Sequence, residues 1–297
     1  MIYNKYIRYI KMRLFYRMKH LQRLSDQELL GLMRHEAHRV EKSVYNNILD
    51  KKRAYYDQKY QLINQITSIL LKRDTKYADH PSIIWAGKIN LAYPDIEKNF
   101  VNTYSSESGV NDDFIKINPE DYFFTRRSCR VWSKQQPSKE ELEAVSERLI
   151  SIGIHAPNSG NRQPWKFAVL IDKDEKEVLK GLKERHCYSA PLLIFVGVDK
   201  RLYKPAEHLE NCLYIDAAAA ATQMIIAAHM LGYGTCWNHL GEDLINSRTM
   251  NKESYAKLCR LKNIEHYVTP VAIIAIGMPE FIPPEPSRVN LDDVLLK

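Results

Sequence analysis

Three short apolar runs constrain the fold of this chain more than any other feature of its sequence. They span residues 166–171, 192–198 and 271–276, and they are rich in β-branched and aromatic residues. Runs of this length and composition are typical of buried strands. Helical patterns lie between and around them, at residues 139–152 and, longer and more apolar, at residues 208–231. Strands and helices that alternate in this way favour a three-layer α/β or α+β core.

Two helix starts are marked by capping boxes. Ser25 precedes Glu28 by three residues, and Ser138 precedes Glu141 in the same way. In such a pair each side chain accepts a hydrogen bond from the backbone N–H of the other residue, which stabilises the first turn. After the capping box of Ser25 and Glu28, apolar residues recur at helical spacing as far as residue 48.

The N-terminal part of the chain is predicted to be an extension. A second helical pattern runs over residues 56–70, so residues 1 to about 75 form a helical region. From about residue 76 to 118 the pattern breaks down around Pro81 and Pro94, which predicts a connecting segment. We therefore expect a helical extension and connecting segment over residues 1–120 and a compact unit over residues 121–297.

The net charge of +7 is concentrated at the N-terminus. Residues 1–23 contain seven Lys and Arg residues and no Asp or Glu, and the rest of the chain has equal numbers of basic and acidic residues. A nucleic-acid-binding protein needs a basic face on its folded body, so we expect no nucleic-acid partner. The arm has two interpretations: a basic amphipathic helix lying on an anionic membrane, or a solvated helix packed against its own N-terminal region.

The location is predicted to be cytoplasmic, and peripheral to the membrane if the arm binds lipid. No apolar run approaches the roughly 18 residues of a membrane span, and no apolar signal core follows the basic arm. The five cysteines form no C-x-x-C pair and lie near no His cluster with metal-ligand spacing. We interpret them as reduced core thiols and expect no metal site.

Two polar segments carry the candidate chemistry. Residues 126–130 read Arg-Arg-Ser-Cys-Arg, and guanidinium and hydroxyl groups are good ligands for phosphate, although a surface arginine run has the same composition. Residues 156–165 read Ala-Pro-Asn-Ser-Gly-Asn-Arg-Gln-Pro-Trp, which is either a structural turn or a polar binding loop. Neither a dinucleotide G-x-G-x-x-G fingerprint nor a phosphate-binding P-loop motif is present.

Taken in order, four motifs resemble those of the FMN-dependent nitroreductase superfamily. They are R-R-S-C-R, A-P-N-S-G-N-R-Q-P-W, G-Y-G-T-C-W and a C-terminal A-I-G-M-P with Arg288 beyond it. The resemblance covers about residues 121–297. It implies an α+β, three-layer fold with a central mixed sheet, preceded here by the helical extension. It also implies a homodimer with FMN in two clefts at the subunit interface.

The resemblance assigns roles to the residues that match those motifs. Arg126, Ser128 and Arg288 would hold the FMN phosphate. Arg127 would lie along the ribityl chain, and Arg130 would sit near flavin N1 and O2, where a cation stabilises the negative charge of the reduced form. Four loop residues would reach the flavin from the partner subunit: Pro157, Asn158, Ser159 and Asn161. Asn158 stands where the family usually has Ser. Backbone groups near flavin N5 would come from His239, Leu240 and Gly241.

The resemblance implies an oxidoreductase that passes electrons from NADH or NADPH through FMN to a small organic acceptor. The cofactor supplies the redox chemistry, so no catalytic acid or base is assigned. Alternatives are a specialised biosynthetic flavin dehydrogenase or reductive dehalogenase of the same fold, and a flavin-binding protein without turnover.

One motif of the extension falls outside this resemblance. Residues 35–42 read His-Glu-Ala-His-Arg-Val-Glu-Lys, which places His35 and His38 on one helix face. The spacing lacks the i, i+4 histidine pair of a zinc protease. A solvated charged face, a metal site and a helix that covers the flavin cleft are the three interpretations.

Overall fold

The computed structural model describes residues 18–45, 53–93, 118–203, 211–241, 251–285, 288–289 and 291–296. The chain forms two compact units. One, the helical unit, contains residues 1–116 together with 157–164 and 199–216, and the other, the sheet unit, contains residues 117–156, 165–198 and 217–297. The polar loop at residues 157–164 thus belongs to the same unit as the N-terminal helices.

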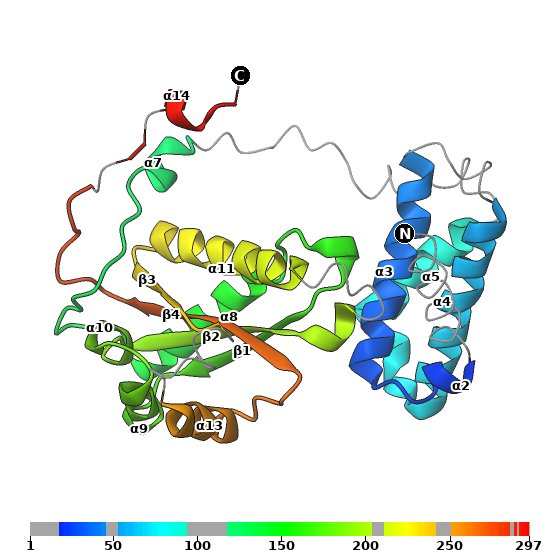
Figure 1. Ribbon diagram of the computed structural model, residues 1–297, viewed down its shortest axis with the longest axis horizontal. Helices are drawn as coiled ribbons and strands as arrows, with labels where there is room; N and C mark the ends of the chain where they lie inside the picture. Colours follow the sequence, from blue (N-terminus) through cyan, green and yellow to red (C-terminus); the bar gives the residue numbers. More distant parts are fainter. Residues whose placement is uncertain are drawn as a thin grey trace. The chain divides into compact units, whose positions relative to one another are not determined.

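The helical unit is built on three long helices (Figure 1). In chain order its elements are α2 (Met18–Leu21), α3 (Asp26–Tyr45), α4 (Arg53–Arg73), the 3-10 helix η2 (Thr75–Asp79) and α5 (Pro81–Ala92), followed much later by the 3-10 helices η4 (Ser159–Asn161) and η6 (Lys200–Tyr203). The predicted capping box is present, because the backbone N–H of Ser25 donates to Glu28 Oε2 at 3.1 Å and that of Glu28 donates to Ser25 Oγ at 3.3 Å.

Helix α5 corrects the prediction of an irregular segment from residue 76. Pro81 occupies the first turn of the helix, where its missing N–H is not needed and its fixed φ is favourable. The ring of His80 accepts a hydrogen bond from Ser82 N–H at 3.1 Å and so caps the helix. Pro81 therefore starts a helix, whereas the sequence pattern predicted the end of helical structure there.

The core of the helical unit lies where α3, α4 and α5 meet. Leu29, Met33, Ile63, Ile66 and Ile89 are fully buried there, at helical spacing within each helix. Burying a side chain of this size stabilises the fold by about 1.5–3 kcal/mol. The helices thus have a core of their own, independent of the sheet.

The sheet unit holds a four-stranded sheet in the order β1-β2-β4-β3. Its elements are α7 (Glu120–Phe123), α8 (Lys139–Gly153), β1 (Trp165–Leu170), α9 (Lys173–Glu177), the 3-10 helix η5 (Val178–Gly181), α10 (Arg185–Tyr188), β2 (Leu192–Asp199), α11 (Cys212–Met230), β3 (Gly234–His239), α13 (Lys252–Leu261), β4 (Val268–Gly277) and α14 (Leu291–Val294). Helix α8 starts at the predicted capping box of Ser138 and Glu141. Three of the strands were predicted, and β3 was not.

The α+β prediction is confirmed, and the pairing of the strands refines it. Strands β1 and β2 pair antiparallel, with Trp165 opposite Val198, and β3 and β4 pair antiparallel, with Gly234 opposite Gly277. The four described strands form an antiparallel sheet, where the resemblance implied a mixed one. The connections β1–β2 and β3–β4 each reverse the chain direction between neighbouring strands. Among the residues that the structure describes, one parallel bridge joins Ser128 to Thr235.

Helices cover both faces of this sheet (Figure 1). On one face η5, α10 and α13 pack over alternate strand residues such as Leu193, Phe195 and Ile273. Helix α11 lies on the other face (Figure 1). It approaches α8 closely, because a Cβ at Gly153 of α8 would lie 3.0 Å from Met224 Cγ of α11. Every residue of β2 and β4 is consequently buried, which explains their continuous apolar sequence.

Helix α11 is also the only described helix long and apolar enough to cross a membrane by length and composition. Its Ala217, Ala220, Ala221, Met224 and Ala228 are fully buried within the protein. A core helix passes the same length and composition test, and the packing of these residues is that of a core helix.

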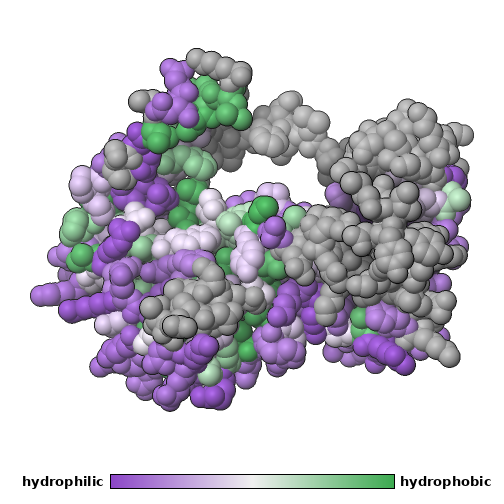
Figure 2. Space-filling model, in the orientation of Figure 1, coloured by the Kyte–Doolittle hydropathy of each residue, from purple (hydrophilic) through white to green (hydrophobic). Residues whose placement is uncertain are grey.

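Exposed apolar residues gather toward the C-terminus. Leu291, Val294, Leu295 and Leu296 have exposed side chains, and Figure 2 shows the corresponding hydrophobic surface over α14. Contiguous apolar surface of this kind marks an interaction site more often than an ordinary solvated surface.

Candidate functional site

The arginine segment runs beside the edge strand β3. Cys129 N–H donates to the carbonyl of Thr235 at 2.8 Å, Ser133 N–H donates to Met278 O at 2.9 Å, and a bridge joins Trp132 to Pro279. Side chains of an extended segment alternate between its two sides. Cys129 is buried, so its neighbours Ser128 and Arg130 face outward.

Gly234 permits this close approach. A Cβ at this position would lie 2.9 Å from both Cβ and Sγ of Cys129 and 3.1 Å from Pro279 Cβ. The second glycine of the G-Y-G-T-C-W motif, Gly234, is therefore required by packing, because a larger residue would push the arginine segment away from β3.

Arg126 and Ser128 line a small cavity of about 240 Å³. The other residues around it are Thr222, Ile225 and Ile226 of α11 and Thr235 and Trp237 of β3. A guanidinium and three hydroxyl groups thus surround the cavity, and none of the described residues that line it is acidic. This is a donor set suited to a phosphate group.

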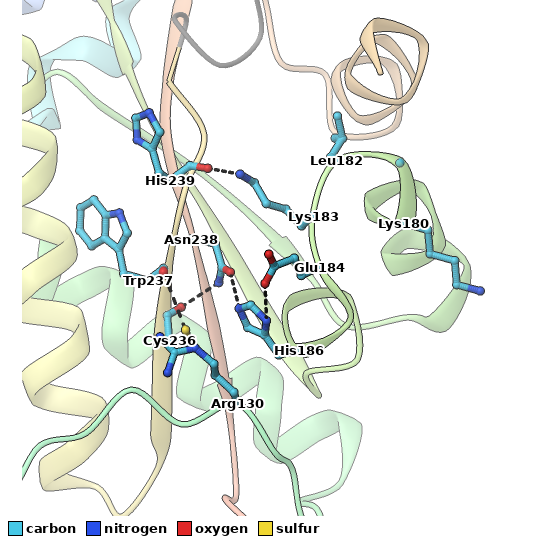
Figure 3. Close-up of a pocket in the computed structure, with 11 residues that line it drawn as sticks. Arg130, Lys180, Leu182, Lys183, Glu184, His186, Cys236, Trp237, Asn238 and His239 are labelled. Atoms are coloured by element: carbon cyan, nitrogen blue, oxygen red, sulfur yellow. Dashed lines mark hydrogen bonds and ion pairs between the residues drawn. The ribbon is translucent and has the colours of Figure 1, made fainter. Parts of the chain in front are cut away.

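Arg130 reaches a second, larger cavity of about 580 Å³ (Figure 3). Its walls come from the α9–α10 region and from β3, and its lining residues are Arg130, Lys180, Gly181, Leu182, Lys183, Glu184, His186, Cys236, Trp237, Asn238 and His239. Trp237, with a third of its surface exposed, lines both cavities. The two cavities therefore share a wall, with Arg126 and Ser128 in one and Arg130 in the other.

A hydrogen-bond network holds the floor of the larger cavity. The ring of His186 makes two contacts: Nε2 hydrogen-bonds to Asn238 Oδ1 at 2.9 Å, and Nδ1 lies 3.3 Å from Glu184 Oε2. The Lys183 ammonium donates to the carbonyl of His239. In Figure 3 Lys180 points away from this network. Burial raises the pKa of the Cys236 thiol, so this cysteine is neutral at pH 7.

The arginine segment also creates a positive potential. Burial and the charges of Arg126 and Arg127 lower the pKa of His229, whose ring bonds Thr125 Oγ1 at 2.8 Å. The neutral form of His229 is favoured because burial penalises the charged ring and the two guanidinium groups repel it. The same field attracts an anion.

Arg127 and Arg288 differ in their surroundings. Arg127 donates to the carbonyls of Phe124 at 2.5 Å and Arg126 at 3.0 Å and lies 3.5 Å from Glu285. These contacts tie the segment to the C-terminal region. Arg288 is exposed and is absent from the described lining of the small cavity. Contacts of these two side chains with a flavin stay predictions.

His239, Leu240 and Gly241 lie at the end of β3. His239 is exposed and lines the larger cavity, whereas Leu240 is fully buried and donates its N–H to Val271 O at 2.9 Å. Gly241 is buried. Of the three, His239 is the residue that the structure brings to the cavity of Arg130.

The predicted loop residues Pro157, Asn158, Ser159 and Asn161 lie in the helical unit. Ser159 donates through both N–H and Oγ to Asp216 Oδ1, at 3.0 Å each. Any further contact of the Ser159 hydroxyl would use its oxygen as an acceptor. Asn158 Oδ1 accepts from Gln163 N–H at 2.9 Å, and Asn161 Oδ1 accepts from Gln163 Nε2 at 3.0 Å.

Several residues around the cavities were missed by the sequence analysis. Lys183, His186 and Asn238 carry no recognisable motif, and Trp237 was noted only as part of G-Y-G-T-C-W. The alternation of β3 was the available signal: Cys236 and Asn238 are buried on one face, and Trp237 and His239 are exposed on the other.

The H-E-x-H motif of the extension is partly buried, which disagrees with one of its three interpretations, the solvated charged face. Glu36 is fully buried and lies 3.0 Å from the Lys59 ammonium of α4. Helix α3 is covered on more than one side, by α4, by α5 and by the loop at residues 157–164. No group of three potential metal ligands occurs among the described residues.

Comparison with known proteins identifies the family. The nitroreductase family profile matches residues 124–185 and 173–278, which together cover just over half of the chain. The chain belongs to the nitroreductase family. The match begins at the arginine segment and ends at β4, so it includes both cavities and leaves the N-terminal helices outside.

Two curated relatives and one solved structure are similar to this chain. A protein of Archaeoglobus fulgidus, provisionally named NADH dehydrogenase/NAD(P)H nitroreductase, is 30% identical over 162 residues, covering 53% of this chain and 83% of the relative. A protein of Methanothermobacter thermautotrophicus with the same provisional name is 26% identical over 181 residues, 57% of this chain and 83% of the relative. A provisionally named nitroreductase of Desulfovibrio desulfuricans, solved in complex with FMN, is 25% identical, with 61% of this chain and 97% of that chain covered and a TM-score of 0.49.

Proposed function

We propose that this nitroreductase-family protein binds FMN and passes electrons from NADH or NADPH to a small organic acceptor. The observation that carries the proposal is the division of the arginine segment between two adjoining cavities. Arg126 and Ser128 face the small cavity and Arg130 the larger one, with Trp237 between them. A flavin nucleotide has the matching polarity, with an anionic phosphate at one end and a ring system at the other.

The small cavity fits the phosphate. Arg126 supplies a guanidinium fork, and Ser128, Thr222 and Thr235 supply hydroxyl donors. Arg288 would add a second cation from the C-terminal segment. The apolar side chains of Ile225 and Ile226 exclude water from one side and so strengthen these charge-assisted bonds.

The larger cavity fits the ring end. When bound, FMN would supply two-electron redox chemistry, and the protein's task would be to orient it and stabilise charge. The Arg130 guanidinium supplies a fixed positive charge, while Lys183 is tied to the end of β3 and His186 is oriented by Asn238. A fixed cation stabilises a developing anion without having to reorganise during the reaction.

The names of the relatives support a nicotinamide electron donor. The relatives in Archaeoglobus and Methanothermobacter are named for NADH and NAD(P)H, which supports a nicotinamide donor here. The acceptor would enter the larger cavity, whose walls carry mostly polar and cationic groups.

A homodimer is the second part of the proposal. Supporting it are the exposed apolar side chains of α14 and its neighbours and of Phe123 and Phe124 in the α7 region, all of which belong to the sheet unit. Such surface is stabilised when a second copy covers it. In a dimer, Pro157, Asn158, Ser159 and Asn161 would reach the flavin of the partner subunit.

The function is tested by absorbance spectroscopy of the purified protein. We expect a yellow protein whose flavin is released on denaturation and identified as FMN by chromatography. Anaerobic mixing with NADH or NADPH should bleach the flavin band, and a nitroaromatic acceptor should restore it. A colourless protein that takes up no added FMN would refute the proposal, and a bound flavin that neither nucleotide reduces would favour a protein without this turnover.

A further inference from the structure

The loop at residues 157–164 has a strained backbone. Asn161 and Gln163 adopt positive φ of 52° each, and Gly160 adopts a φ of 62°. Asn tolerates this conformation, but Gln adopts it only at a cost in backbone strain. A conformation of this kind persists only where surrounding contacts hold it in place.

Helix α3 supplies those contacts. The ring of His35 bonds the carbonyl of Gly160 at 3.0 Å through Nδ1, and Arg34 Nη2 donates to the carbonyl of Arg162 at 2.8 Å. A Cβ at Gly160 would lie 2.2 Å from His35 Nδ1, so the ring is seated directly against the backbone of the loop. Two consecutive residues of α3 thus bind two carbonyls of the strained segment.

Arg162 holds the loop from within. Its side chain is buried and donates to Ser159 O at 2.6 Å and to Leu202 O at 3.1 Å. The guanidinium carbon lies 5.5 Å from the centre of the Tyr203 ring. Its Nη2 also lies 3.4 Å from His35 Nε2. A neutral His35 protonated on Nδ1 satisfies both contacts, because Nδ1–H then donates to Gly160 O and Nε2 accepts from Arg162.

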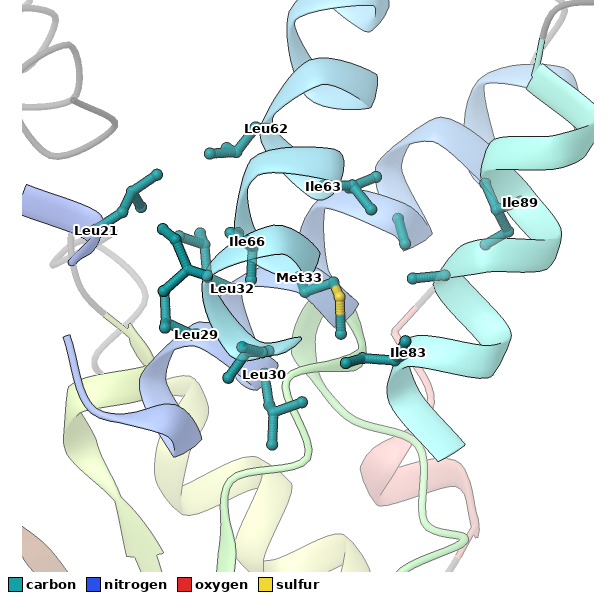
Figure 4. Close-up of a cluster of buried hydrophobic side chains, with 14 of the residues drawn as sticks. Leu21, Leu29, Leu30, Leu32, Met33, Leu62, Ile63, Ile66, Ile83 and Ile89 are labelled. Atoms are coloured by element: carbon teal, nitrogen blue, oxygen red, sulfur yellow. The ribbon is translucent and has the colours of Figure 1, made fainter. Parts of the chain in front are cut away.

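The opposite face of α3 is anchored in the helical core. Leu29, Met33 and Ala37 are fully buried against α4 and α5 (Figure 4). Arg34 is fixed as well, since its Nη1 donates to Ser82 Oγ of α5 at 3.0 Å. The loop is therefore attached to a rigid helix bundle.

We propose that His35 and Arg34 are positioning residues for the flavin, which set the backbone of residues 158–163 so that its amides meet the cofactor. This rests on the proposed function, in which that loop contacts FMN. The N-terminal extension is then an integral part of the flavin site and not an appended module.

The test compares His35→Leu with His35→Asn in the full-length protein. Leu removes the donor to Gly160 O, whereas the Asn amide can reproduce the donor at the position of Nδ1. His38→Leu is the matched control, because His38 lies on the same helix but pairs with Glu41, at 3.2 Å. Each variant is first compared with the wild type by far-UV circular dichroism.

The first measurement does not need flavin. Trypsin cleavage at the Arg162–Gln163 bond is followed by mass spectrometry on protein stripped of flavin, because release of the loop exposes the buried Arg162. We expect His35→Leu to be cleaved at least tenfold faster than wild type, and His35→Asn and His38→Leu to be cleaved within twofold of it. Equal cleavage of all four proteins would overturn the proposal.

The second measurement is the Kd for FMN, with the visible circular dichroism of the bound flavin as a spectroscopic signature. His35→Leu should bind about tenfold more weakly and show an altered signal, and His35→Asn should restore both. Faster cleavage with unchanged FMN binding would also overturn the proposal. If neither the wild type nor any variant binds FMN, the proposed function fails. The cleavage result still decides whether α3 sets the conformation of the loop.

If His35→Leu does not fold, Arg34→Lys replaces it with the same expectations. Lys keeps the positive charge but cannot reach both acceptors.

Discussion

Arg130 differs from its neighbours in the cavity that it reaches. Arg126 and Ser128 line the small cavity, and Arg130 lines the larger one. If the flavin ring occupies the larger cavity, Arg130 acts on the energy of the reduced flavin more than on its retention.

We expect Arg130→Ala to keep most of its FMN but to have a lower reduction potential, because the reduced anion loses a nearby cation. For a two-electron couple a shift of about 30 mV corresponds to roughly 1.4 kcal/mol, and a shift of this order is expected. Potentiometric titration measures it, with Arg130→Lys as the charge-preserving control. Arg126→Ala should show the reverse pattern, with FMN lost and a near-normal potential in the remainder. An unshifted potential in Arg130→Ala would disprove the assignment to the ring.

His35 makes the stability of the protein depend on pH. Burial, followed by the charge of Arg162, lowers the pKa of His35 from 6.5 to about 4; Arg39 acts in the same direction and Glu36 opposes it. Between these values the unfolded chain binds a proton that the folded protein does not, so stability falls as the pH falls.

We expect the wild type to lose about 2 kcal/mol of unfolding free energy from this group between pH 7.5 and pH 5. Urea denaturation at the two pH values measures the loss. His35→Asn has no ionisable group at this position, so its loss should be smaller by that amount. Equal losses in the two proteins would show that His35 titrates normally in the fold.

At the scale of elements, the pairing of the arginine segment with β3 depends on Gly234. We expect Gly234→Ala to destabilise the protein by about 1–3 kcal/mol, because the added methyl group overpacks against Cys129. The segment carrying Arg126, Ser128 and Arg130 would move, so FMN binding should weaken as well.

Gly87→Ala is the matched control for this variant. No atom lies within 4 Å of a Cβ at Gly87, and the residue is inside α5, where Ala is favoured over Gly by about 0.5–1 kcal/mol. The thermal midpoint should rise in Gly87→Ala and fall in Gly234→Ala. A Gly234→Ala protein with wild-type stability and FMN content would show that the segment does not depend on this close approach.

The elements that the sequence predicted well are those with a local physical signal. The capping boxes at Ser25 and Ser138 and the buried strands β2 and β4 each have such a signal in consecutive residues. Strand β3 was missed because Gly234, Asn238 and His239 are poor strand formers, and it is pairing with β4 that makes it a strand.

The same limit applies to the candidate site. The motif residues Arg126, Ser128 and Arg130 were found from residue type and order. The contact of His35 with Gly160 joins positions 125 residues apart, and no periodicity in the chain indicates it. The burial of Glu36 was equally hidden, because a charged residue is placed in a core only by a partner such as Lys59 on another helix.

At the scale of the whole molecule, the apolar C-terminal region predicts how the protein assembles. We expect deletion of residues 291–297 to convert a dimer into a monomer, because it removes the exposed side chains of Leu291, Val294, Leu295 and Leu296. Size-exclusion chromatography with light scattering measures the mass. FMN should be lost with the dimer if the site includes the partner's loop. A wild-type monomer that retains FMN would contradict both statements.

The basic arm makes a separate prediction. Residues 1–17 lie outside the described residues, but Leu21 is fully buried in the helical core, so a deletion that leaves the core intact must end before α2. We propose that the arm binds anionic membranes, where each Lys or Arg contributes about 1 kcal/mol. The deletion of residues 1–17 should then abolish sedimentation with phosphatidylserine vesicles at low salt while FMN content stays unchanged. Equal sedimentation of both proteins would leave the arm without a membrane role.

The helical unit is assembled from three separate stretches of the chain, and this fixes when it can be completed during synthesis. Its last residue, Asp216, is added roughly 120 residues after the end of α5. At about 5–20 residues per second this interval lasts roughly 6 to 24 s. Throughout that time the Gly160 carbonyl that His35 binds either does not yet exist or has no Asp216 to hold its neighbour Ser159. Helix α3 is thus made early but reaches its final contacts only after residues 199–216 have been added, and in that interval a chaperone that acts on nascent chains can bind it.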